Sequence, residues 1–140
     1  MTTLERLKIL REVVARESSI VHSQSTWGIH YGDHDPDDEN HCGTIACALG
    51  KFALSSEGQE MGFRHEWVEL SHGDGWQLKI SGEGGVPRES TTECATRIFG
   101  ITYEQARRLF DEIYGLIAPS RHKGIALNRI DSLMQELVCA

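Results

Sequence analysis

The fold prediction rests on one stretch, His41-Cys42-Gly43-Thr44-Ile45-Ala46-Cys47-Ala48-Leu49-Gly50. Within it and just beyond it, the large apolar residues Ile45, Leu49 and Phe52 recur at helical spacing, and a stripe of small residues lies beside them. A helix that is apolar over this much of its surface belongs in a protein core. We therefore expect a central helix over Gly43–Ser55, with the other elements packed around it.

Capping signals predict the helices on either side of this centre. Three pairs have the spacing of a capping box: Thr2 with Glu5, Ser90 with Glu93, and Thr102 with Gln105. The first pair opens an amphipathic pattern over residues 3–16. Gly100 and Gly115 are expected to close the two later helices, and a last helix is expected after Pro119.

Two stretches in the middle of the chain are typical of strands. Residues Gly75–Ile80 alternate apolar with polar side chains, and Phe63–Leu70 precede them across the turn-forming sequence H-G-D-G. A shorter alternation at residues 27–31 indicates a further extended piece. Together these patterns predict an α+β fold, a mainly helical single domain over residues 1–140 with one antiparallel β-hairpin packed on a central helix.

Composition excludes several classes of partner. The 140 residues carry a net charge of −7, so the chain lacks the basic surface that nucleic acids and anionic membranes select. No apolar run approaches the roughly 20 residues that cross a bilayer. The first residues are typical of an amphipathic helix rather than of a signal peptide. We therefore expect a cytoplasmic protein without direct nucleic-acid binding or membrane association.

Cys42 is the first candidate for catalysis. A thiol at a helix N-terminus is favoured as thiolate, although the acidic residues between Asp33 and Glu39 oppose that effect. His65, at the start of the first strand of the hairpin, is the natural base. A cysteine on a helix followed by a histidine on a strand is similar to the order in papain-like and transglutaminase-like enzymes, but the aspartate expected after the second strand is missing. The alternative is a small buried cysteine that packs in the core.

The same region raises the possibility of a metal site. Six candidate zinc ligands lie within thirteen residues: His30, Asp33, His34, Asp35, His41 and Cys42. Neither zinc-finger spacing nor the glycine of a calcium-binding EF-hand loop is present. A solvated acidic loop that leads into a helix N-terminus explains the same residues. We assign no metal ligand and expect no cofactor, with the His- and Asp-rich loop as the alternative.

Aromatic residues offer a third kind of site. Trp27 and Tyr31, together with His41, are candidates for a ligand-binding pocket. The alternative is that the tryptophans and tyrosines belong to the core or form cross-strand pairs.

Two motifs carry a resemblance to other proteins. Residues 42–50 have the pattern C-G-T-x-x-C-x-x-G, and residues 95–110 have the pattern A-x-x-x-x-G-[IL]-[ST]-x-x-x-A-x-x-L-F. In both, the chain resembles a group of small uncharacterised proteins of bacteria and their phages. The resemblance implies a structural unit whose members are Cys42, Gly43, Thr44, Cys47 and Gly50. It also implies that Cys47 and Gly50 face a neighbouring helix, and it implies no activity.

We therefore expect a small acidic accessory protein, phage-related, and not an enzyme. We expect it to bind a protein partner or a small molecule. One concrete version is an acidic inhibitor of an enzyme that handles nucleic acids. The alternatives are a cysteine-dependent hydrolase or transferase that uses Cys42 and His65, and a metal-binding protein that uses the His- and Asp-rich loop. The sequence does not predict an oligomeric state.

Overall fold

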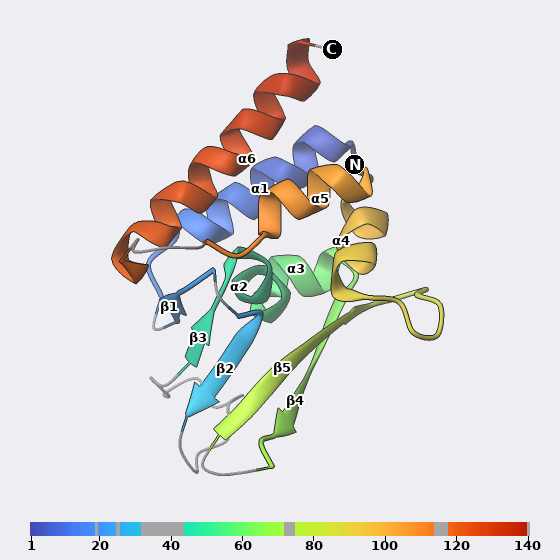
Figure 1. The fold of residues 1–140 in the computed structure, drawn as a ribbon. Coiled ribbons are helices and arrows are strands. Elements are labelled where there is room, and N and C mark those ends of the chain that lie inside the picture. The colour runs from blue at the N-terminus through green and yellow to red at the C-terminus, as the bar shows by residue number, and fades with distance from the viewer. Residues whose placement is uncertain (19, 25, 32–43, 72–74, 114–117, 140) are drawn as a thin grey trace.

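The chain folds into a mixed sheet with a layer of helices gathered at one end of it (Figure 1). The computed structural model describes residues 1–18, 20–24, 26–31, 44–71, 75–113 and 118–139. The arrangement is α+β and mainly helical, as predicted. None of the helices in the described ranges is long and apolar enough to cross a membrane.

The helices follow the capping signals closely. Their bounds are α1 Thr3–Ala15, α2 Ala48–Leu54, α3 Ser56–Met61, α4 Thr91–Phe99, α5 Tyr103–Phe110 and α6 His122–Cys139, with a 3₁₀ turn η1 at Pro119–Arg121. The capping boxes at Thr2 and Thr102 are confirmed. Ser90 accepts a hydrogen bond from the amide of Glu93 and begins α4, and Gly100 ends that helix in the left-handed conformation.

The sheet has five strands in the order β1-β3-β2-β5-β4. Their bounds are β1 Val21–His22, β2 Gly28–Tyr31, β3 Thr44–Ala46, β4 Phe63–Glu69 and β5 Gly75–Gly82. The predicted hairpin is confirmed as the antiparallel pair β4 and β5, and the extended piece near residue 29 is confirmed as β2. The short pair β1 and β3 is parallel, whereas the other pairs are antiparallel. The turn at residues 72–74 lies outside the described residues.

The prediction of one helix over Gly43–Ser55 is wrong in its first part. Thr44–Ala46 form β3, which lies between β1 and β2, and the helix begins only at Ala48. The backbone amides and carbonyls of this short run form hydrogen bonds with two neighbouring strands. Its β-branched residues Thr44 and Ile45 also favour extended structure. Cys47 then caps α2, because its sulfur accepts a hydrogen bond from the Gly50 amide at 3.4 Å.

The helix that begins after Thr102 is shorter than predicted. It ends at Phe110, and Asp111 leaves the helix with extended backbone angles. The carbonyl of Asp111 accepts a hydrogen bond of 2.7 Å from the Arg129 guanidinium on α6, which fixes the chain as it turns away. Gly115, which we expected to close this helix, lies outside the described residues.

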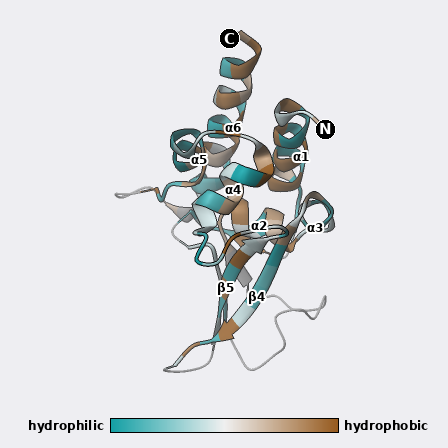
Figure 2. Cartoon of the chain, turned by 90° about the vertical axis from the view of Figure 1, so that its right-hand side faces the viewer, coloured by the Kyte–Doolittle hydropathy of each residue, from teal (hydrophilic) through white to brown (hydrophobic). Residues whose placement is uncertain are grey.

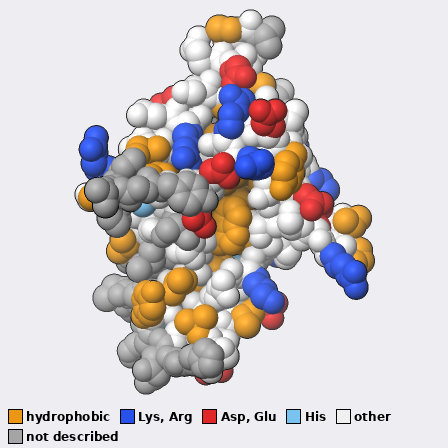
Figure 3. Space-filling model, in the orientation of Figure 1, with side chains coloured by type: hydrophobic (Ala, Val, Ile, Leu, Met, Phe, Trp, Pro, Cys, Tyr) orange, Lys and Arg blue, Asp and Glu red, His pale blue; other side chains and the backbone are white. Residues whose placement is uncertain are grey.

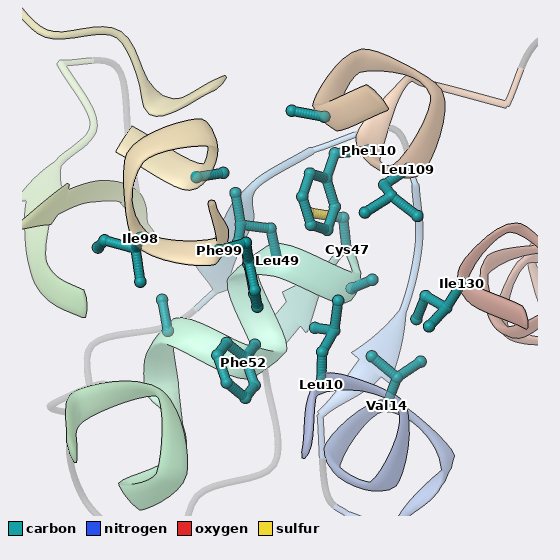
Figure 4. Packing of buried hydrophobic residues seen from close by; sticks show 14 of the residues in the cluster. Leu10, Val14, Cys47, Leu49, Phe52, Ile98, Phe99, Leu109, Phe110 and Ile130 are labelled. Atoms are coloured by element: carbon teal, nitrogen blue, oxygen red, sulfur yellow. The ribbon is translucent and has the colours of Figure 1, made fainter. Parts of the chain in front are cut away.

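The core is centred on α2, as the apolar spacing of its residues predicts. Its residues Leu49 and Phe52 are fully buried, and Phe52 packs its ring against Phe63 of β4 and Phe99 of α4 at centroid distances of 5.7 and 5.6 Å. Figure 4 shows α2 between α1, α4 and α5, with their apolar side chains converging on it. Of the hairpin, β4 supplies Phe63 and β5 supplies Leu78 to this core. The predicted packing of the hairpin on the central helix is confirmed.

Gly50 shows why α2 carries a small-residue stripe. A Cβ added there would lie 1.7 Å from the carbonyl oxygen of Trp27. The stripe at this position therefore faces the backbone just before β2, not a helix as the resemblance implies. Cys47 lies beside Phe110 of α5 (Figure 4).

Candidate functional site

The proposed catalytic pair cannot be placed as a pair. Cys42 lies outside the described residues, as does His41. His65 lies on β4, half-buried, beside a shallow hollow of about 500 Å³ that is also lined by Ser56, Gln59, Glu60 and Arg64. No cysteine lines this hollow among the residues that the structure describes.

The cysteines that the structure does describe differ in exposure. Cys47 and Cys94 are buried, whereas Cys139 near the end of α6 is exposed. Burial raises the pKa of the Cys47 thiol to about 11 and that of the Cys94 thiol to about 11. Both are therefore protonated near neutral pH, which makes them poor nucleophiles.

The metal alternative falls mostly on residues that are not described. Asp33, His34 and Asp35 lie in that part of the chain, and His30 is buried on β2. Within the described ranges, no group of three or more histidine, cysteine or acidic side chains is placed to hold a metal ion.

The structure places the aromatic candidates Tyr31 and Trp27 in different surroundings. The Tyr31 side chain, at the end of β2, is 54% exposed. Trp27 is half-buried immediately before β2 and lines a pocket of about 260 Å³. The walls of this pocket come from four parts of the fold, and its lining residues are Gln24, Thr26, Trp27, Cys47, Gln77, Phe110 and Glu112.

The pocket forms where three connections meet. Gln24 and Trp27 belong to the segment between β1 and β2, and Cys47 is the residue between β3 and α2. The backbone amide of Cys47 donates to the Thr26 carbonyl at 3.0 Å, which ties the first two segments together. The third segment is the end of α5 and the residues after it, which supply Phe110 and Glu112.

Gln24 is the most constrained side chain in the pocket wall, and only 1% of it is exposed. Its Oε1 accepts two hydrogen bonds of 2.8 Å, one from the backbone amide of Ala48 and one from Nε2 of His22. Its backbone amide donates to Nδ1 of His122, at the start of α6, at 3.2 Å. These contacts hold the residue between β1, α2 and α6.

One polar atom of the Gln24 side chain makes no hydrogen bond to a described residue. The amide nitrogen Nε2 of Gln24 is buried and has no hydrogen-bond partner among the described residues. The backbone amide of Ala48 fixes the orientation of the Gln24 amide, because it can only donate and therefore requires the acceptor Oε1 there. The pocket wall therefore contains a buried donor with unused capacity.

The His22 side chain, which donates to Gln24, is neutral near pH 7. Burial lowers the pKa of His22 to about 4. Its Nε2 donates to Gln24, so its Nδ1 carries a lone pair; that atom is also buried without a partner among the described residues. The deep wall of the pocket is therefore polar but uncharged.

The aromatic and charged side chains around this wall determine which kind of ligand the pocket can bind. Trp27 and the buried Phe110 supply aromatic surface, and Glu112 is an exposed carboxylate at the rim. Cys47 contributes a protonated thiol that already caps α2. The arrangement provides hydrogen-bonding and aromatic surface for a bound molecule, and its thiol is not activated for attack.

Lys51 is a buried cation on α2, one turn after Cys47. Its ammonium donates to the carbonyls of Val14 at 3.1 Å and Arg16 at 2.5 Å. Burial lowers its pKa to about 8. These carbonyls belong to the C-terminus of α1, so Lys51 completes the end of that helix and has a structural role.

Sequence reasoning found Trp27 but missed Gln24, Cys47, Phe110 and Glu112 as pocket residues. Gln24 lies in a segment without periodicity, and its partners are far away in sequence. The later motif contains Phe110, but helical spacing marks that residue only as core. The chain matches no protein family model, and neither a curated protein nor a solved structure shows significant similarity to it.

Proposed function

We propose that this protein is a non-catalytic accessory protein that binds a small planar ligand in the pocket between Gln24, Trp27 and Phe110. The observation that carries the proposal is the buried amide nitrogen of Gln24, which lies in the pocket wall without a described partner. Leaving a buried donor unsatisfied costs about 1–3 kcal/mol. A ligand carbonyl or ring nitrogen that accepts from this amide recovers that free energy.

The size and lining of the pocket narrow the ligand class. Its volume of about 260 Å³ lies just below the usual range for ligand pockets, so the ligand is no larger than a nucleobase or a small aromatic amide. Trp27 and Phe110 favour a flat ring, because aromatic side chains stack on planar groups. The ligand therefore combines a planar ring with a hydrogen-bond acceptor.

Glu112 at the rim of the pocket makes the pocket selective for the charge of the ligand. Glu112 attracts a donor or cationic group and repels a carboxylate, and the net charge of −7 reinforces that preference. A neutral amide, which has an acceptor for Gln24 and a donor for Glu112, matches both ends of the pocket. An accessory role in the cytoplasm, phage-related and exerted on a protein partner, belongs to the same proposal. The net charge of −7 favours a partner with a basic surface.

Three probes of nearly equal shape test the proposal: benzamide, benzamidine and benzoate. Each is titrated into the ¹⁵N-labelled full chain while amide and indole resonances are followed by NMR. We expect benzamide to bind with a dissociation constant on the order of 1 mM and to shift the Trp27 indole and the Gln24 side-chain amide. Benzoate is expected to bind more weakly than benzamidine because of Glu112.

Two variants locate the binding. Gln24→Met removes the donor and is expected to weaken benzamide about tenfold, since a hydrogen bond contributes on the order of 1 kcal/mol. Tyr31→Phe changes an exposed residue of β2 outside the pocket and is expected to leave binding unchanged. If none of the three probes moves the resonances of the pocket, or if benzoate binds as well as benzamide, the proposal is wrong.

A further inference from the structure

A groove runs between α5 and α6, apart from the pocket beside Gln24. Figures 1 and 2 show the two helices next to each other, and Figure 2 shows hydrophilic and hydrophobic residues alternating along α6. Arg108 of α5 donates to Glu136 of α6, and Arg129 of α6 donates to the carbonyl of Asp111, just after α5. The residue numbers run in opposite directions in these two contacts, so the helices are antiparallel. The groove has a volume of about 280 Å³.

The inner part of this groove is apolar and aliphatic. Leu109 of α5 and Leu133 of α6 are buried there, and Ile125 of α6 is partly exposed beside them. No aromatic side chain is present among the described residues that line the groove. The lining therefore suits an aliphatic chain, which stabilises the bound state by covering apolar surface.

Arg129 is a cation of this groove that forms no ion pair with a carboxylate of the described residues. Its Nη1 donates to the Asp111 carbonyl at 2.7 Å, which occupies one of the several N–H donors of the guanidinium. Burial lowers the pKa of Arg129, and the charge of Asp111 offsets only part of that effect. The guanidinium is thus partly removed from water without a directly bonded anion, and an anion placed beside it is stabilised.

The other two charges of the groove neutralise each other. Nη2 of Arg108 donates to both carboxylate oxygens of Glu136, at 3.3 and 3.1 Å. Arg129 therefore gives the lining a net charge of +1, although the whole chain carries −7. Figure 3 shows basic and acidic side chains close together on the face where α5 and α6 lie. The charge preference of the groove is opposite to that of the pocket beside Gln24, whose rim carries Glu112.

We propose that the groove between α5 and α6 is a second ligand site, which binds a small aliphatic carboxylate. The carboxylate pairs with Arg129, and the aliphatic chain lies along Leu109, Leu133 and Ile125. Ser132 is exposed three residues after Arg129, on the same side of α6, and offers a hydroxyl donor to the same carboxylate. The groove shares no lining residue with the pocket beside Gln24, so this proposal and the proposed function stand or fall separately.

Three probes with the same carbon chain test this site: hexanoate, hexanamide and hexylamine. Each is titrated at low salt into the full chain, labelled with ¹⁵N and with ¹³C at the methyl groups, and followed by NMR. We expect hexanoate to bind with a dissociation constant on the order of 1 mM and to shift the methyl resonances of Leu109 and Leu133. The Trp27 indole, in the other pocket, is expected to stay unshifted. Hexanamide and hexylamine lack the negative charge and are expected to bind about tenfold more weakly or worse.

Two variants remove the free charge of the groove in different ways. Arg129→Gln removes the cation, and Ser132→Asp gives Arg129 a carboxylate of its own at an exposed position of α6. Each is expected to weaken hexanoate about tenfold or more. Ser132→Asn, which has nearly the shape of Ser132→Asp without its charge, is expected to leave binding unchanged. So is Arg107→Gln, which removes an exposed arginine of α5 outside the groove.

Circular dichroism shows which variants are folded, and Ser132→Asp keeps the test decisive if Arg129→Gln is not. Hexanoate that shifts no resonance of the groove, or shifts only that of Trp27, overturns the proposal. So does hexanamide that binds as tightly as hexanoate, or hexanoate binding that a folded Ser132→Asp protein retains in full. N-Acetyl-leucine represents the carboxyl end of a peptide. If it binds more tightly than hexanoate, the groove accepts a peptide end and the proposal of a free aliphatic acid is wrong.

Discussion

Oε1 of Gln24 accepts a hydrogen bond of 2.8 Å from the backbone amide of Ala48, the first residue of α2. The contact joins the segment before β2 to the start of the central helix. It also satisfies an amide that the helix itself leaves without a partner. The pocket wall and the helix start therefore depend on the same side chain.

Replacing Gln24 by methionine tests this dependence. The change keeps the length of the side chain but leaves the amide of Ala48 without its acceptor, and we expect a loss of about 1–3 kcal/mol in the free energy of unfolding. Urea denaturation measures the effect. Gln77→Met alters an exposed glutamine of the same pocket and is expected to cost less than about 0.5 kcal/mol. Equal stability of the two variants would show that the hydrogen bond to Ala48 contributes little.

Local signals predicted most of the helices, and long-range contacts explain the errors. Thr2 and Thr102 cap helices through bonds to residues three positions away, so the sequence alone is enough to place them. Thr44–Ala46 become a strand because β1 and β2 lie on either side, and neither neighbour is close in the chain. Apolar spacing over a short run does not distinguish the two structures.

The pocket was less predictable than the fold for the same reason. Trp27 stood out as an aromatic residue in a short alternating stretch, but Gln24 is important only because Ala48, His22 and His122 surround it. No periodicity marks such a residue. Its role comes from a meeting of segments that lie up to 98 residues apart.

Gly50→Ala is expected to be strongly destabilising. Alanine usually stabilises a helix relative to glycine by about 1 kcal/mol, but here its Cβ would overlap the Trp27 carbonyl, which is backbone and cannot move aside. We expect a net loss of more than about 2 kcal/mol, measured by urea denaturation. Gly124→Ala in α6 is the matched control, since a Cβ there meets nothing within 4 Å and should stabilise the protein by up to about 1 kcal/mol. A stable Gly50→Ala protein would contradict the close approach of α2 to the segment before β2.

Thiol reactivity tests both the core and the catalytic hypothesis. In the folded protein at pH 8, we expect iodoacetamide to modify Cys139 about tenfold or more faster than Cys47 and Cys94, because burial keeps those two thiols protonated and inaccessible. Peptide mass spectrometry follows each site, and denaturation should make all of them react. Rapid modification of Cys47 in the folded state would refute its placement at the start of α2.

The same experiment measures Cys42 directly. A catalytic Cys42 activated by His65 requires fast alkylation that slows when His65 is replaced by alanine. Modification of Cys42 at the rate of an ordinary exposed thiol, unchanged by His65→Ala, would rule out the hydrolase or transferase alternative. The control His122→Ala removes a histidine from another part of the fold, beside Gln24.

The buried imidazole of His22 makes stability depend on pH in a defined window. Burial lowers its pKa from 6.5 to about 4 in the folded protein, so between these values the unfolded chain binds a proton that the folded chain does not. Stability is therefore fully present above pH 6.5 and falls as the pH drops toward 4, by up to about 3 kcal/mol from this residue. Urea denaturation at pH 7, 5.5 and 4.5 measures the decline. His22→Gln removes the titrating group and should flatten the curve over this range, whereas His65→Gln, at a half-buried position on β4, should leave the contribution of His22 intact. If the His22→Gln protein loses stability as steeply as the natural chain, the imidazole of His22 is not the group that is buried uncharged.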